Sequence, residues 1–202
     1  MKYFNIKTVD VRGTLSHGSG CSIDINVIFE GKVLLGDNVT IGSNCIIKDS
    51  VIGNNTIIKP FTQIEESLIN DYCNIGPYAN LRKGSKIDNN TSIGNFVEIK
   101  DSHIGQSCKI NHLSFIGDSI LEENVTIGAS TITCNHNGNE FKKITIRKNS
   151  YIGSGTKLIA PLEVGENATI GSGSVITKNV VPNKLTLSRS KQVVVNSWIK
   201  RT

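Results

Sequence analysis

The feature that most constrains this chain is a hexapeptide repeat. An aliphatic residue recurs every five or six positions, usually followed by glycine or a small polar residue. The series consists of Leu35, Ile41, Ile47, Ile52, Ile58, Ile64, Ile69, Ile75, Leu81, Ile87, Ile93, Ile99, Ile104, Ile110, Ile116, Leu121, Ile127, Ile146, Ile152, Leu158, Val164, Ile170 and Ile176. A helix needs a period near 3.6 and an exposed strand a period of two, so neither fits. The repeat predicts a parallel β-helix of short strands and turns.

Three repeat units would close one triangular coil, so residues eighteen apart should stack on neighbouring coils, about 4.8 Å from each other. Burial of each inward aliphatic side chain stabilises such a fold by roughly 1.5–3 kcal/mol. Before Leu35 the pattern is looser, and we expect Ile23 to Val33 to form the first coil. The pairs expected to stack include Ile75 on Ile93, Leu81 on Ile99 and Ile152 on Ile170.

Two segments interrupt or end the repeat. The insert CNHNGNEFKKIT between Thr133 and Ile146 is polar and rich in turn residues, so we predict a projecting loop at about 134–145. The repeat stops after about Val181, and we expect the extension 181–202 to lie across the last coil and cover its strand edges. Residues 1–202 are thus predicted to form a single all-β domain with one loop and a C-terminal tail.

Composition narrows the possible partners. The net charge of +5 is spread over scattered lysines without an aromatic-basic stripe, which argues against nucleic-acid binding and leaves a small anionic substrate open. No apolar run is long enough to span a membrane, and Met1 to Asp10 lacks the apolar core of a secretion signal. The five cysteines form no CxxC pair, so we expect no disulfide framework, no metal and a cytoplasmic location.

Two cations share one position of successive coils. Arg82 and Lys100 each follow an inward aliphatic residue and are eighteen residues apart. Stacked like charges are destabilising, unless a bound anion such as a phosphate lies between them. The alternative is that both side chains turn into solvent or pair with acids such as Glu98, and spacing alone favours this alternative.

Histidines and cysteines offer few other reactive groups. His112, in KINHLSFIG, lies about a coil further along than Lys100, so it could act as a general base beside an anion site. His17 and His103 are expected to be surface residues, whereas His136 in the loop could equally contact a ligand or be idle. Cys134 has no base beside it in the sequence, so we do not expect it to be a nucleophile.

Several motifs resemble one known family along most of the chain. From about Val11 to Gln192 the sequence contains, in order, VRGTLSHG, VIFEG, IIKDSVIG, IGPYANLRKGS, IGNFVEIKDS, INHLSFIGDS, IGASTITCNHNG, LIAPLEVGENATIGSGSVIT and LSRSKQ. They resemble the acetyltransferase half of the bifunctional N-acetylglucosamine-1-phosphate uridylyltransferases and glucosamine-1-phosphate N-acetyltransferases. The resemblance implies a left-handed coil, acetyl-CoA as co-substrate, and a homotrimer with sites between subunits, in which the loop reaches a neighbour.

The resemblance also implies roles for individual residues. Arg82 and Lys100 match the residues that hold the phosphorylated amino sugar, and His112 matches the general base, with Glu98 as a weaker candidate to orient it. Two sugar-site positions depart from the family: Phe115 stands for a tyrosine and Thr126 for an asparagine. In the loop, His136 and Asn137 replace family residues, and a substrate-binding lysine is displaced or replaced near Phe141. The implied acetyl-CoA contacts are Ala129, Asn135, His136, Ser154, Ser172 and Arg189.

The reaction implied is acetyl transfer from acetyl-CoA to the amine of a phosphorylated amino sugar, foremost glucosamine 1-phosphate, in cell-envelope precursor synthesis. No glycine-rich nucleotidyltransferase loop is present, so uridylyl transfer is not expected. The chain could be a free-standing acetyltransferase or one half of a longer protein. One alternative is another sugar or nucleotide-sugar acceptor in surface-polysaccharide synthesis. The other is a non-catalytic solenoid that serves binding or assembly.

Overall fold

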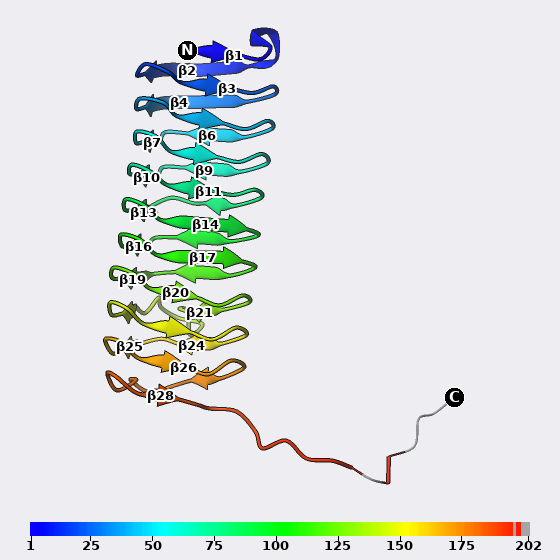
Figure 1. Ribbon diagram of the computed structural model, residues 1–202, viewed down its shortest axis with the longest axis vertical. Coiled ribbons are helices and arrows are strands. Elements are labelled where there is room, and N and C mark those ends of the chain that lie inside the picture. Colours follow the sequence, from blue (N-terminus) through cyan, green and yellow to red (C-terminus); the bar gives the residue numbers. More distant parts are fainter. Residues whose placement is uncertain (196, 199–202) are drawn as a thin grey trace.

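The chain forms a three-sided, left-handed parallel β-helix whose coils stack along one axis (Figure 1). The computed structural model describes residues 1–195, 197 and 198. A single short 3-10 helix, Ile6–Thr8, precedes the regular coils among these residues. The all-β fold predicted from the hexapeptide repeat is therefore confirmed.

The three faces of the prism are named here by their order within a coil. The first face contains β1 (Lys2–Tyr3), β3 (Ser22–Ile23), β5 (Thr40–Ile41), β8 (Ile57–Ile58), β11 (Asn74–Ile75), β14 (Ser92–Asn95), β17 (Lys109–His112), β20 (Thr126–Ile127), β23 (Tyr151–Ile152), β26 (Thr169–Ile170) and β28 (Leu185–Thr186). The second face contains β6 (Ile46–Lys48), β9 (Gln63–Glu65), β12 (Asn80–Leu81), β15 (Glu98–Lys100), β18 (Phe115–Gly117), β21 (Ile132–Cys134), β24 (Lys157–Ile159) and β27 (Val175–Ile176).

The third face contains β7 (Val51–Ile52), β10 (Leu68–Ile69), β13 (Lys86–Ile87), β16 (His103–Ile104), β19 (Ser119–Leu121), β22 (Ile144–Ile146) and β25 (Leu162–Val164). The longer strands β2 (Asp10–His17) and β4 (Ile28–Leu35) run along both the second and the third face. We call the bend between the first and second faces the first corner, and the bend between the second and third faces the second corner.

The registers follow the predicted spacing. Each aliphatic residue of the repeat is at most 3% exposed, so the inward ladders form one continuous core. The turns use left-handed backbone: Phe61, Tyr78 and Phe96 all have φ between 54° and 59° at the first corner. The predicted stacking pairs are all observed: Ile75 with Ile93, Leu81 with Ile99 and Ile152 with Ile170.

The first coil begins earlier than predicted. Strand β1 pairs with β3, and β2 pairs with β4 over its whole length, so residues before Ile23 already belong to the solenoid. Tyr3, Val9 and Leu15 pack against the core at six-residue intervals. The expectation that Ile23 to Val33 forms the first coil is wrong. The additional inward series of Tyr3, Val9 and Leu15 precedes it, and the aliphatic pattern misses this series because its first residue is aromatic.

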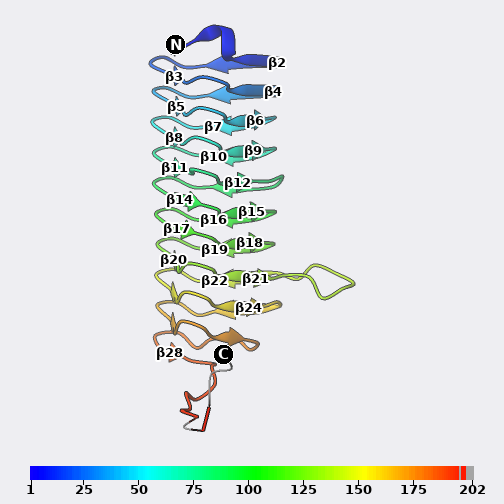
Figure 2. The ribbon, with the colours of Figure 1, turned by 90° about the vertical axis from the view of Figure 1, so that its right-hand side faces the viewer.

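A loop projects from the second corner between β21 and β22 (Figure 2). It occupies 135–143, because Cys134 still belongs to β21 and the buried Ile144 begins β22. At the C-terminal end, β28 pairs with β26, and the Arg189 side chain still reaches the last coil.

Beyond Arg189 the chain leaves the coils (Figure 1), and Val193, Val194 and Val195 are 62–79% exposed. The expectation that the extension through Thr202 lies across the last coil is therefore wrong for this part; residues 196 and 199–202 lie outside the described residues. No helix in the described part of the chain is long and apolar enough to cross a membrane.

Candidate active site

A column of charged side chains runs along the end of the second face, next to the second corner. Strand registers align one residue of each coil in this charged column: Arg12, Glu30, Lys48, Glu65, Arg82 and Lys100. The signs alternate from Arg12 to Arg82, and ion pairs of 2.8 Å join Arg12 to Glu30 and Lys48 to Glu65. Lys100 breaks the alternation, so the predicted stack of two cations is present.

Neither cation of this stack is without a partner. The Arg82 guanidinium donates to Glu98 Oε1 at 2.7 Å, as the alternative drawn from the sequence expected. Lys100 Nζ lies 3.5 Å from Asp101 Oδ2 and 4.8 Å from the centre of the Phe141 ring. Half-exposed ion pairs are worth about 0–1 kcal/mol, so a phosphate that accepts from both cations could displace these partners.

A second column, of one histidine followed by small residues, lies at the first corner. His112, Ala129, Ser154 and Ser172 occupy the same place in successive coils, directly before the turn. We call His112, Ala129, Ser154 and Ser172 the amide column, after their backbone N–H groups. Arg189 lies at its C-terminal end, where the guanidinium donates to the Ser172 carbonyl oxygen at 3.0 Å. Ser154 and Ser172 are eighteen residues apart, and they stack on neighbouring coils as that spacing predicts.

Glycines leave the backbone of the amide column open. A Cβ on Gly128 would lie 2.5 Å from Ser154 N, and one on Gly153 would press against Ser172 N. Among the described residues, no hydrogen bond from the N–H of Ala129, Ser154 or Ser172 is present. The column therefore presents three backbone donors in a line, which fits an elongated ligand rich in acceptor groups.

His112 ends β17 at the N-terminal end of the amide column. Its Nδ1 lies 2.9 Å from Asn95 Oδ1, and Asn95 is its strand partner on the preceding coil. An amide oxygen accepts only, so this contact assigns the ring proton to Nδ1 and leaves Nε2 with a lone pair. The geometry suits a proton acceptor.

The structure does not bring His112 to the cation stack within one chain. Gly117, the strand partner of Lys100, comes five positions after His112, around the first corner and along β18, which at about 3.3 Å per residue is a path on the order of 15 Å. The expectation that His112 follows Lys100 by about a coil is wrong. Twelve residues are only two thirds of a coil, so the two side chains lie at different corners.

Within one chain Glu98 does not contact His112, so the orienting role that the resemblance implies for Glu98 stays a prediction. Glu98 lies on the outer side of the second face, where it pairs with Arg82. Asn95 occupies the orienting position at His112 within one chain. The sequence signal for Asn95 was its place seventeen residues before His112, about one coil away.

The remaining predicted residues divide between the same two regions. Phe115 lies beside Glu98 on the second face, and its ring covers Gly117. Asn135 donates to Asp118 Oδ2 at 2.6 Å at the loop base, and the His136 ring packs at a tilt against Phe141 with ring centres 4.5 Å apart. Thr126 lies on the first face between Lys109 and Tyr151, near the amide column.

A groove of about 270 Å³ opens beside His112, on the side away from Ala129. It continues the first corner toward the N-terminal coils, and its lining contains Lys59, Gly76, Pro77, Ser92, Ile93, Gly94, Asn95, Asn111 and His112. His112 therefore separates two open sites: this groove on one side and the amide column on the other.

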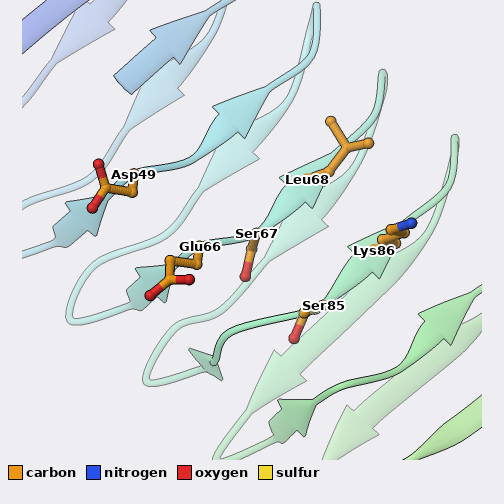
Figure 3. Close-up of a pocket in the computed structure, with 7 residues that line it drawn as sticks. Asp49, Glu66, Ser67, Leu68, Ser85 and Lys86 are labelled. Carbon is orange, nitrogen blue, oxygen red and sulfur yellow. The ribbon is translucent and has the colours of Figure 1, made fainter. Parts of the chain in front are cut away.

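A larger hollow, of about 480 Å³, lies at the second corner (Figure 3). Asp49 and Glu66 border it at the turns, while Leu68 and Lys86 lie along the strands. It contains none of the predicted site residues, and Lys83 already pairs with Glu66 at 2.9 Å.

The cysteines fit structural positions. Cys21, Cys45, Cys73 and Cys108 are buried, and burial raises the pKa of the thiols of Cys45, Cys73 and Cys108 to about 11. Cys134 is partly exposed at the loop base. No group of three or more potential metal ligands occurs within residues 1–195, 197 and 198.

Comparison with known proteins agrees with this architecture. Residues 143–178 match the family model described as bacterial transferase hexapeptide (six repeats). The fold resembles the UDP-N-acetylglucosamine acyltransferase from Campylobacter jejuni, with a TM-score of 0.59 at 16% identity over 90% of this chain and 70% of that one. The corresponding enzyme from Bacteroides fragilis gives a TM-score of 0.56 at 20% identity, over 88% and 69%. At this identity the likeness shows the fold alone.

The sequence relatives confirm the predicted resemblance, and this chain contains the hexapeptide repeat of the bacterial transferases. More particularly, it is 46% identical over 191 residues to the bifunctional protein GlmU of Azoarcus sp. (strain BH72), over 94% of this chain and 42% of that protein. The GlmU of Baumannia cicadellinicola is 49% identical over 189 residues, over 94% of this chain and 40% of the relative. The chain thus spans about two fifths of these curated relatives.

Proposed function

We propose that the chain is an acetyl-CoA-dependent N-acetyltransferase for a phosphorylated amino sugar, with glucosamine 1-phosphate as the first acceptor to test. The observation that carries this proposal is the amide column, in which His112 and three open backbone donors follow one another at one corner. The relatives named GlmU support a role in the synthesis of cell-envelope sugars.

The amide column suits the co-substrate. Acetyl-CoA supplies the activated acetyl group as a thioester, and its long arm carries many hydrogen-bond acceptors. Ala129, Ser154 and Ser172 have small side chains, so their N–H groups stay accessible to such an arm. Arg189 adds a cation at the far end of the column.

His112 would act as the general base. Only a neutral amine is nucleophilic, so His112 Nε2 takes the proton as the amine nitrogen forms its bond to the thioester carbonyl carbon. The N–H of Ala129, next along the column, would donate to the oxygen that becomes negative. When the carbon–sulfur bond breaks, the proton passes from His112 to the departing thiolate.

The acceptor's phosphate would be held by Arg82 and Lys100 from a neighbouring copy. Within one chain these cations lie at the second corner, whereas His112 lies at the first corner, on a different side of the prism. A homotrimer in which the second corner of one copy meets the first corner of the next would complete the site. The projecting loop, with Asn135 and His136, would then reach the neighbour's coenzyme.

The test is the release of free thiol from acetyl-CoA with glucosamine 1-phosphate as acceptor. The proposal expects stoichiometric release of coenzyme A and formation of the N-acetylated sugar. A panel that adds glucosamine, other amino-sugar phosphates and nucleotide-linked amino sugars would identify a different acceptor. Coenzyme binding without thiol release on any member would contradict the proposed function and favour a solenoid used for binding or assembly.

A further inference from the structure

The groove beside His112 has features that point to a ligand site. Its floor follows the first corner through four successive coils, at Lys59, Gly76, Gly94 and Asn111. The two glycines have no side chain to fill the space between the two longer residues. His112 and Asn95 form one wall, so the groove begins at the proposed base.

The two glycines make the hollow a fixed property of the backbone. Gly76 has φ of +92°, which residues with a Cβ rarely adopt. A Cβ on Gly94 would press against the carbonyl oxygen of Asn111 on the next coil. The floor therefore cannot be filled by ordinary substitutions without moving the coils.

The groove lining combines the cation Lys59 with neutral residues, both polar and apolar. None of its nine lining residues is an acid, and no ion pair of Lys59 occurs in the described part of the chain. The charged column differs in this respect, because Arg82 and Lys100 both have carboxylates nearby. Lys59 thus carries an uncompensated positive charge into a concave site.

The spacing fits a small ligand with an amine and an anionic group. Three coils separate the backbone of Lys59 from that of Asn111, which is about 14 Å at the usual strand spacing. The lysine side chain shortens this gap from one end and the His112 ring from the other. An amino-sugar phosphate carries its amine and its phosphate on one ring, which suits the space left.

We propose that Lys59 binds the anionic group of the acceptor in the groove that starts at His112. This inference deepens the proposed function and rests on it for the reaction. It assigns acceptor recognition partly to the chain that supplies the base, in addition to the cation stack of a neighbouring copy. Lys59 would act as a point charge for a phosphate and would thereby select phosphorylated over neutral amino sugars.

The experiment compares Lys59→Ala, Lys59→Arg and Lys59→Glu with the wild type. Binding of glucosamine 1-phosphate is titrated calorimetrically without acetyl-CoA, and thiol release is then measured with glucosamine 1-phosphate and with glucosamine. We expect Lys59→Ala to raise the Kd and the KM for the phosphorylated sugar about tenfold or more, with Lys59→Arg close to wild type. The Lys59→Glu change should abolish binding of the phosphorylated sugar, while glucosamine is affected less than about twofold.

Lys86→Ala is the matched control, because Lys86 is an exposed lysine on the third face. It should bind and acetylate the sugar as the wild type does. An unchanged Kd for glucosamine 1-phosphate in Lys59→Ala, or a wild type that does not bind this sugar, would overturn the proposal. A wild type that binds the sugar but releases no thiol would overturn the proposed reaction alone, and the Kd comparison would still decide the role of Lys59.

Discussion

The charged column and the amide column lie at opposite ends of the second face. They differ in whether their polar groups have partners within the chain. In the charged column, carboxylates accompany the cations along most of its length. In the amide column, glycines expose backbone donors that have no partner among the described residues. The difference shows that a charge column can be largely structural, while the groups open to a ligand are backbone amides that carry no residue-type signal.

The largest expected effect separates His112 from an ordinary histidine of the same solenoid. His112→Ala should lower kcat by about 10²–10⁴-fold, the usual worth of a general base, and leave the coenzyme Kd unchanged. His103→Ala is the control, because His103 pairs with Asp88 at 2.8 Å on the third face. Steady-state rates and coenzyme titrations measure both. Equal turnover in the two variants would remove His112 from the mechanism.

A glycine substitution tests whether the open amides bind the coenzyme. Gly153→Ala pushes a methyl group against Ser172 N, so we expect the coenzyme Kd to rise at least about tenfold. Gly171→Ala is the matched control in the next coil, since its Cβ would meet only the end of the flexible Leu187 side chain. Calorimetry with coenzyme A and a thermal melt on each variant separate binding from stability. Equal affinities in two folded variants would contradict the role of the column.

The third prediction divides the charged column itself. Lys100 has a cation beside it in the column, whereas Lys48 lies between Glu30 and Glu65. Lys100→Ala should raise the KM for a phosphorylated acceptor by up to about tenfold, because a charge-assisted contact is lost. Lys48→Ala should leave that KM unchanged and cost about 0–1 kcal/mol of unfolding free energy. Equal shifts of KM in both variants would contradict the idea that the break in sign alternation at Lys100 marks the phosphate site.

The smallest effect concerns the thiols. The pKa of Cys45, Cys73 and Cys108 is raised to about 11 by burial, so at pH 8 these thiols stay protonated in the folded protein. We expect a thiol reagent to label Cys134 first, at the loop base. Thiols in the unfolded chain ionise at lower pH than these three buried thiols. The contribution of the buried thiols to the free energy of unfolding is therefore complete below about pH 8.5 and is lost as pH rises toward 11. Rapid labelling of all five thiols in the native state would contradict this.

Much of the fold could be predicted because one rule generates it. The hexapeptide spacing gave the inward residues and the stacking of Ile75 on Ile93, and it placed Arg82 beside Lys100. It did not reveal the first coil, where Tyr3 replaces an aliphatic residue. Pattern reasoning depends on residue type, so it loses a coil when an unusual side chain fills the inner position.

The site was harder to predict than the fold. Residues eighteen apart lie in one column. His112 is twelve positions after Lys100, which is not a whole coil, so the two residues lie at different corners. The ion pair between Glu98 and Arg82 and the hydrogen bond between Asn95 and His112 depend on side-chain directions that the repeat does not encode. The open amides of Ser154 and Ser172 follow only from the neighbouring glycines.

The central claim is that one chain carries two halves of a site, which different copies bring together. Mixing the His112→Ala and Lys100→Ala variants by co-expression or refolding tests it most directly. If the site combines His112 of one copy with Lys100 of the next, random assembly restores about one quarter of the sites to wild-type composition. Measured at an acceptor concentration well below KM, where the loss of Lys100 lowers the rate, the thiol-release rate of the mixture should then rise above that of either variant alone. A mixture no more active than the average of the separate variants would contradict the account.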